Sequence, residues 1–175
     1  MYHLLWSMDK IKDTILKIEQ LKLDKKFKEA ILMLEESISI YHGDYRLYEE
    51  LSDIYLYETK LDKALTAVDY ALELNPESAT GNYLKGFILL SQEEIESAII
   101  YLEKSNSLMG NNSEVLRNLG WAYTMVGQTD RGITILKRAL NIAPEDELIT
   151  EDLAMALIGS GHITEGNSLL KRIGK

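Results

Sequence analysis

Residues 113–146 read SEVLRNLGWAYTMVGQTDRGITILKRALNIAPED, and this stretch decides the fold. Its large apolar residues recur three or four positions apart in two runs, which are Leu116, Leu119 and Tyr123, and then Ile133, Leu136 and Leu140. That spacing places each run on one face of an α-helix. Gly127 lies between the runs, where a chain leaving a helix favours a residue that tolerates positive φ, and Pro144 ends the second run. The stretch therefore predicts two helices joined by a short turn.

The rest of the chain repeats this pattern at intervals of 34 residues. Small residues align in one column, made up of Ala30, Ala64, Ala98, Gly132 and Gly166. A second column is also small, with Ser37, Ala71, Ser105 and Ala139, and a third is aliphatic, with Ile40, Leu74, Leu108 and Ile142. Two helices that cross closely need a small side chain at the crossing, because a larger one holds the backbones apart. The columns therefore predict helix pairs that pack through their small residues.

We predict five units of one helix–turn–helix each, over residues 11–44, 45–78, 79–112, 113–146 and 147–175. A single pair of helices cannot bury its apolar face, so neighbouring units must stack into an all-α solenoid. Residues 1–10 form an N-terminal extension that contains Leu4, Leu5 and Trp6. We expect the first helix to begin near Leu4 and the extension to cap the open end of the stack. The alternative is that the extension docks onto another molecule.

The repeat pattern resembles the tetratricopeptide repeat family over residues 11–175. The fourth unit is the most similar, through Leu116, Leu119, Gly120, Tyr123, Gly132, Leu136, Ala139 and Pro144. The sequence departs from the family pattern at Lys85 in the third unit and at Ile173 in the fifth. The resemblance implies a right-handed superhelix, with first helices on the concave side and second helices on the convex side. It also implies a protein-interaction module.

The composition disfavours several classes of binding partner and several cellular locations. The 175 residues contain 19 Lys and Arg against 28 Asp and Glu, and the resulting net charge of −9 disfavours nucleic acid and anionic membranes. There is no cysteine, and therefore no disulfide and no thiolate chemistry. No apolar run approaches the roughly 18 residues that a membrane span needs, and the N-terminus lacks the pattern of a secretion signal. We expect a cytoplasmic protein without membrane insertion.

The sequence shows no pattern that is typical of an enzyme. It has no glycine-rich phosphate loop and no HExxH motif, and His3, His42 and His162 lie far apart. We expect no catalysis, no cofactor and no metal. One subset of the family grips a C-terminal carboxylate of chaperones with Lys, Asn and Arg from successive first helices, and only Asn118 matches that set here. We therefore do not expect a chaperone adaptor of that kind.

A candidate binding groove follows the first helices of the units. Positions i, i+4 and i+7 or i+8 of a helix share a face. Along these helices that face carries Tyr57, Tyr83, Phe87, Leu90, Arg117, Trp121, Met125 and Met155, with an acidic flank at Glu49, Asp53 and Glu151. An apolar patch bordered by charge is typical of an interaction site, in which Trp and Tyr are favoured.

The competing interpretation is that these side chains pack against the adjacent first helix and form core. We expect Trp121 to be exposed, because three other residues of its helix already form the core face. Phe87 fits either interpretation.

We predict an adaptor or chaperone-like module that binds an apolar segment of a partner protein or peptide in this groove. One alternative is a self-assembling scaffold, or homo-oligomer, joined through Leu4, Leu5 and Trp6 at one end and residues 163–172 at the other. Another alternative is that the chain is the targeting or regulatory part of a larger complex.

Overall fold

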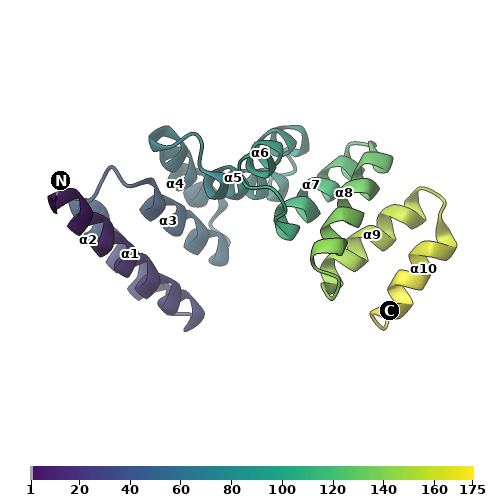
Figure 1. Ribbon diagram of the computed structural model, residues 1–175, viewed down its shortest axis with the longest axis horizontal. Helices are drawn as coiled ribbons and strands as arrows, with labels where there is room; N and C mark the ends of the chain where they lie inside the picture. Colours follow the sequence, from purple (N-terminus) through teal and green to yellow (C-terminus); the bar gives the residue numbers. More distant parts are fainter. Residues whose placement is uncertain (1) are drawn as a thin grey trace. The chain divides into compact units, whose positions relative to one another are not determined.

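The computed structural model describes the backbone of residues 2–175 and the side chains of residues 10–175. Within these residues the chain consists of α-helices and short connections, without a β-strand (Figure 1). The helices are α1 (Tyr2–Leu23), α2 (Phe27–Ile40), α3 (Tyr45–Tyr57), α4 (Leu61–Leu74), α5 (Ala79–Ser91), α6 (Ile95–Leu108), α7 (Ser113–Met125), α8 (Thr129–Ile142), α9 (Glu147–Gly159) and α10 (Ile163–Arg172). The predicted all-α fold is confirmed.

The helices form pairs that recur at the predicted interval. The second helices of the pairs begin at residues 27, 61, 95, 129 and 163, each 34 residues after the one before. The first helices from α3 onward begin at residues 45, 79, 113 and 147, with the same interval. Second helices pack against the next first helix in α2–α3, α6–α7 and α8–α9, and first helices contact each other in α1–α3 and α7–α9. This is the packing of tandem helix–turn–helix repeats.

Helix α1 begins at Tyr2, slightly before the expected position of Leu4. The side chains of Leu4, Leu5 and Trp6, for which we expected a capping or docking role, lie outside the described side chains.

Capping side chains set the start of each first helix after α1. Asp44, Asn112 and Asp146 stand at the N-cap positions of α3, α7 and α9, where each side chain accepts a hydrogen bond from a backbone N–H of the first turn. Ser78 precedes α5, and its Oγ accepts a hydrogen bond from the Gly81 N–H at 3.2 Å. The four capping residues are spaced 34 apart, so the same local chemistry starts each of these helices.

The turn inside each pair contains one residue with positive φ, with or without glycine. Gly127 and Gly161 supply it in the last two pairs, with φ of 81° and 90°. The equivalent residues Lys25, Thr59 and Glu93 adopt φ of 57°, 56° and 63°. A β-carbon makes the left-handed region costly by about 1–2 kcal/mol, and a β-branched residue fits it worst. The turn geometry therefore persists where the local sequence opposes it.

The column of small residues lies at close crossings between helices. Ala30, Ala64 and Ala98 are fully buried. A β-carbon added to Gly132 of α8 would lie 2.7 Å from the carbonyl oxygen of Gly120 and 2.5 Å from Oγ1 of Thr124, both on α7. These distances leave no room for a methyl group, so the column is small because the backbones meet there.

The chain divides within α5 into two compact parts, residues 1–84 and 85–175. The first part has a buried core that includes Ile11, Ile18, Ala30, Leu34, Leu47 and Ile54. The second part has buried clusters that include Leu116, Ala139 and Ile149, and also Ile133, Leu136, Leu153, Ala156 and Leu157. The apolar runs read from residues 113–146 are thus core of the second part.

Alanine at two glycine positions should have opposite effects on stability. Gly132→Ala places a methyl group against the backbone of α7, so we expect the free energy of unfolding to fall by about 1–3 kcal/mol. Gly159 of α9 has open space around the corresponding position, so Gly159→Ala should raise it by roughly 0.5–1 kcal/mol. Urea denaturation measures both variants. Equal stability of the two would show that Gly132 does not mark a close crossing.

Glycine in the turn between α3 and α4 should stabilise the protein. Thr59→Gly removes a left-handed strain of about 1–2 kcal/mol and adds backbone entropy to the unfolded chain worth about 0.5–1 kcal/mol. We expect a net gain of roughly 0.5–1 kcal/mol in the free energy of unfolding. Thermal denaturation detects it as a higher melting temperature. The matched reverse change, Gly127→Thr, should lower the melting temperature, and the same sign for both changes would refute the strain argument.

Candidate protein-binding surfaces

Large apolar side chains lie exposed on the first helices of the last two pairs, and three of them belong to the predicted groove. Trp121 and Met125 project from α7 and Met155 projects from α9, with exposed fractions of 37%, 55% and 53%. Trp121 and Met155 occupy equivalent positions, 34 residues apart, on two helices that contact each other. We refer to these three residues as the first-helix surface. Leu116 and Leu119 of the same helix are buried, so α7 has one core face and one apolar face in solvent.

Ion pairs border the first-helix surface. Arg117 lies one turn before Trp121 on α7, and its Nη1 is 3.5 Å from Oδ2 of Asp152 on α9. Glu151, one turn before Met155, accepts a hydrogen bond from Nζ of Lys175. Burial raises the pKa of the Asp152 carboxyl, although the charge of Arg117 opposes that shift. The charges next to the apolar side chains are therefore already paired within the chain.

The remaining predicted groove residues lie on other helices. Tyr57 ends α3 and is 63% exposed, with its ring stacked on Phe27 at a centroid distance of 5.6 Å and an interplanar angle of 17°. Tyr83, Phe87 and Leu90 of α5 are half-buried, so their burial does not distinguish a groove position from a core position. Of the predicted set, the second part of the chain brings together Arg117, Trp121, Met125, Glu151 and Met155.

Glu49 does not belong to an exposed acidic flank. Its exposed fraction is only 6%, and its Oε1 accepts a hydrogen bond from Oγ of Ser78, the residue that precedes α5. A β-carbon on Gly81 would come within 2.9 Å of the same oxygen, so this glycine leaves room for the carboxylate. Burial raises the pKa of the Glu49 carboxyl, while hydrogen bonds from Ser78 and Gly81 act against that shift. The predicted exposure of Glu49 is wrong, because the start of α5 covers this side chain.

Asp53 takes part in an ion-pair cluster between α1 and α3. Lys22 of α1 places its Nζ 2.6 Å from Oδ2 of Asp53 and 2.7 Å from Oε2 of Glu50. Burial opposes the charge on Lys22, but the hydrogen bonds that its ammonium group donates to Asp53 and Glu50 outweigh burial and raise the pKa of Lys22. Burial also raises the pKa of the Glu50 carboxyl. The acids of α3 therefore hold two helices together and do not present a flank of free negative charge.

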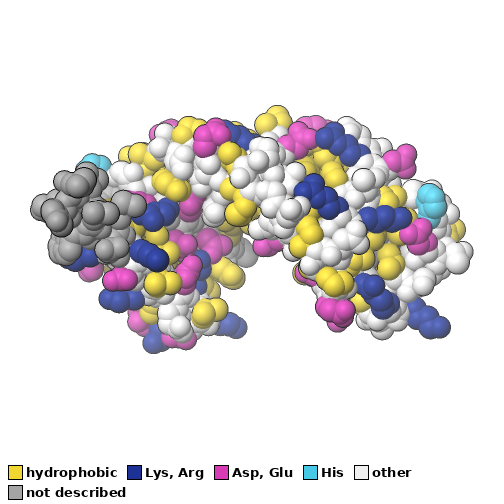
Figure 2. Space-filling model, viewed as in Figure 1, with side chains coloured by type: hydrophobic (Ala, Val, Ile, Leu, Met, Phe, Trp, Pro, Cys, Tyr) yellow, Lys and Arg dark blue, Asp and Glu magenta, His cyan; other side chains and the backbone are white. Residues whose placement is uncertain are grey.

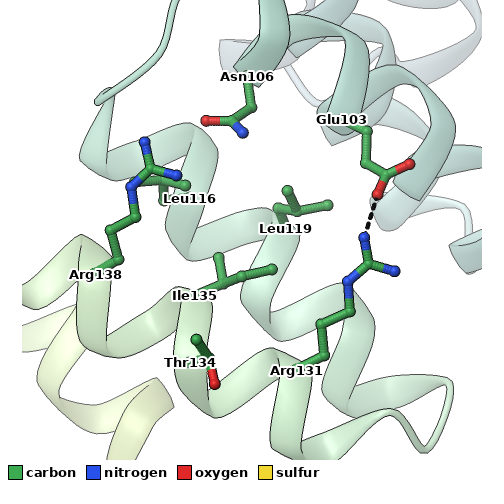
Figure 3. Close-up of a pocket in the computed structure, with 8 residues that line it drawn as sticks. All are labelled: Glu103, Asn106, Leu116, Leu119, Arg131, Thr134, Ile135 and Arg138. Carbon is green, nitrogen blue, oxygen red and sulfur yellow. Dashed lines mark hydrogen bonds and ion pairs between the residues drawn. The ribbon is translucent and has the colours of Figure 1, made fainter.

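A second candidate site, absent from the sequence-based prediction, lies between second helices. A pocket of about 460 Å³ is lined by Glu103 and Asn106 of α6, Leu116 and Leu119 of α7, and Arg131, Thr134, Ile135 and Arg138 of α8. Figure 3 shows the aliphatic side chains in the middle of this group, with the two guanidinium groups on either side. We refer to it as the α6–α8 pocket. It combines an apolar floor with a polar rim, as ligand sites commonly do.

The two arginines of the α6–α8 pocket differ in how they are held. Nη2 of Arg131 lies 2.7 Å from Oε1 of Glu103, and its guanidinium carbon is 3.9 Å from the centre of the Tyr123 ring. The Tyr123 hydroxyl also donates to Glu103, and burial together with this carboxylate raises the pKa of Tyr123 to about 12. Arg138 instead donates from Nη2 to Oδ1 of Asn111 at 2.7 Å. Glu103 therefore neutralises Arg131, whereas the partner of Arg138 is a neutral amide.

Asn106 is the unusual member of the pocket lining. The repeat places Ile38, Leu72 and Leu140 at the equivalent positions, so a carboxamide interrupts an aliphatic column. Its Oδ1 is buried and accepts no hydrogen bond, which costs about 1–3 kcal/mol. The interruption of the column is the sequence signal that could have revealed this pocket.

Other kinds of site find little support among the described residues. Within residues 10–175, no cluster of three or more His, Asp or Glu side chains is arranged to hold a metal ion. None of the described helices combines the length and the apolar character that crossing a bilayer requires. His42 and His162 are both exposed. On the face drawn in Figure 2, hydrophobic, basic and acidic side chains are interspersed.

Comparison with known proteins places the fold. A family model described as tetratricopeptide repeat matches residues 79–111. Protein O-mannosyl-transferase TMTC1 of Homo sapiens is 29% identical over 131 residues, which span 73% of this chain but only 15% of that protein. MamA 41-end from Desulfovibrio magneticus RS-1 has a TM-score of 0.80 at 20% identity, covering 94% of this chain and 93% of the other. YrrB, described as a TPR protein with an unusual peptide-binding site, has a TM-score of 0.73 at 15% identity, with 90% and 81% covered.

Glu49→Gln should change how stability depends on pH. The folded pKa of Glu49 lies above its ordinary value of 4.5, so the folded state binds this proton more tightly than the unfolded state does. Protonation therefore adds stability to the wild type as the pH falls from about 7 through the folded pKa towards 4.5. The variant lacks this titration, so the unfolding free energy of the wild type minus that of the variant should grow over this window.

Urea denaturation at several pH values from neutral to weakly acid measures this difference. Glu77→Gln, at an exposed position next to Ser78, is the matched control for the loss of one carboxylate. A difference for Glu49→Gln that stays constant across this pH range would contradict burial as the cause of the raised pKa.

Proposed function

Because the chain is built of tetratricopeptide repeats, we propose that it is a non-catalytic scaffold that binds a partner protein through the first-helix surface. The observation that carries this proposal is the exposure of Trp121, Met125 and Met155, three large apolar side chains on two contacting helices. The ligand in this proposal is an apolar segment of the partner.

The energetics of apolar side chains support binding at this surface. Full burial of a large apolar side chain contributes on the order of 1.5–3 kcal/mol relative to leaving it in water. Tryptophan is among the residues that most often dominate interface energies, and methionine adapts its shape to varied apolar partners. A partner that covers Trp121 and Met155 together gains from both, since the two residues project from neighbouring helices.

The pairing of the nearby charges narrows the chemistry of the proposed ligand. Arg117 is paired with Asp152 and Glu151 with Lys175, so a charged ligand would have to displace an existing partner. We therefore infer that apolar contact provides the affinity and that charge contributes little. An amphipathic helix with apolar side chains one turn apart suits such a surface. A peptide-binding site on YrrB, a protein of the same fold, is consistent with a peptide ligand here.

Peptide selection tests this proposal directly. A phage-displayed library of random dodecapeptides is selected on the wild-type protein, and the affinity of the enriched peptides is measured by fluorescence anisotropy. We expect enrichment of apolar residues at helical spacing. Trp121→Ala should weaken binding by about 2 kcal/mol or more, which is roughly 30-fold in Kd. Added salt should change the affinity little, because apolar contacts are not screened.

Ile142→Ala is the matched control for the selection. Ile142 lies on second helix α8 and is 42% exposed, comparable to Trp121, so its removal should leave the affinity unchanged. Thermal denaturation of both variants checks that they are folded. Peptides that bind Trp121→Ala as tightly as the wild type would exclude the first-helix surface as the binding site.

A further inference from the structure

The residues that lie 34 positions after those of the α6–α8 pocket allow a comparison between the pocket and the next unit. One repeat later, Asn106 is replaced by Leu140, which packs against the buried core of the second part. Arg138 is replaced by Arg172, which donates to the carbonyl oxygen of Pro144 at 3.1 Å and to Oγ1 of Thr150 at 3.0 Å. At the equivalent position an aliphatic side chain therefore packs on the core, and the arginine is bonded to oxygens of the chain itself.

The α6–α8 pocket lacks that aliphatic side chain, and its arginine, Arg138, donates only to the carboxamide oxygen of Asn111. Asn106 brings a carboxamide whose oxygen is buried without a hydrogen-bond donor. Figure 3 shows this carboxamide above the aliphatic side chains and between the two guanidinium groups. A carboxamide can both donate and accept, so it can bind a peptide group of a ligand with its two polar ends. An amide N–H from a ligand would supply the donor that the oxygen lacks after a small rotation of the side chain.

The charge of the pocket favours an acidic ligand. Its lining contains Arg131, Arg138 and one acid, Glu103, which already pairs with Arg131 at 2.7 Å. The charge of Arg138 is left without a carboxylate among the lining residues, in a chain whose net charge is −9. A guanidinium group binds carboxylates through paired hydrogen bonds, which makes Arg138 the natural contact for an acidic side chain.

We propose that the α6–α8 pocket binds a short acidic peptide segment in which an Asp or Glu stands next to an aliphatic residue. The carboxylate pairs with Arg138, the peptide backbone hydrogen-bonds to the Asn106 carboxamide, and the aliphatic side chain packs on Leu119 and Ile135. A free inorganic anion would satisfy only the first contact, and an apolar segment only the last. The volume of about 460 Å³ accommodates a few residues. This site is separate from the first-helix surface, and its existence does not depend on that proposal.

Nuclear magnetic resonance of the ¹⁵N-labelled full chain tests the proposal with two defined peptides. The probe is the blocked pentapeptide Ac-Gly-Leu-Asp-Leu-Gly-NH₂, and its neutral counterpart carries Asn in place of Asp. We expect the acidic peptide to shift the side-chain amide signals of Asn106 and the Nε–H signal of Arg138, with a Kd at least tenfold lower than that of the neutral peptide. Added salt should weaken the acidic peptide, because a charge pair contributes to its affinity.

Three variants decide between this site and a general attraction of acids. Asn106→Leu restores the aliphatic column, so it should abolish binding while the melting temperature stays level or rises. Arg138→Gln should abolish binding of the acidic peptide, and the matched change Arg172→Gln, one repeat later, should leave it unchanged. Equal affinity for the two peptides, or binding that survives Asn106→Leu and Arg138→Gln in folded protein, would overturn the proposal. Shifts confined to Trp121 and Met155 would overturn it as well.

Discussion

The close approach of the two helices within a pair is the constraint on which the rest of the structure depends. It requires one position of each second helix to be alanine or glycine, and at Gly132 even a methyl group would meet the backbone of α7. The contact at this position fixes the rotation of the second helix about its own axis. The residue one turn later must then point into the core, and Leu34, Val68, Leu102 and Leu136 are all fully buried there.

Positions away from the helix crossing can hold different residue types, and these differences distinguish one unit from another. Glu49, Tyr83, Arg117 and Glu151 occupy the same repeat position. Glu49 is buried against Ser78, Arg117 pairs with Asp152, and Glu151 pairs with Lys175. These residues occupy the same position of a first helix, so the residues packed against them from elsewhere in the chain decide whether a side chain at this position is structural or available to a partner. Function in such a fold lies in departures from the repeat.

The contrast between constrained crossing positions and variable positions explains which features could be predicted from the sequence. The helix pairs could be predicted because the apolar spacing within each helix and the 34-residue interval between units can both be read directly from the sequence. The burial of Glu49 depends on Ser78, the last residue of its own unit, and on Gly81 of the following unit, and the pattern along one helix face includes neither of them. Lys85, at an apolar position of the family pattern, is accommodated with its Nζ 4.4 Å from the centre of the Tyr101 ring. Contacts between side chains of different helices cannot be predicted from the residue pattern along one helix.

Helix α7 links the two candidate sites, since each uses a different face of it. Residues advance by about 100° around an α-helix, so Leu119 and Trp121 point in directions about 160° apart. Leu119 lines the α6–α8 pocket and is buried, whereas Trp121 stands in the first-helix surface. A ligand on one face therefore leaves the other uncovered, and two segments of one partner could occupy both sites at once. Linked binding of that kind raises the overall affinity without a new contact, because the second segment is held at a high effective concentration. A scaffold with two modest sites on one helix would bind such a partner far more tightly than either segment alone.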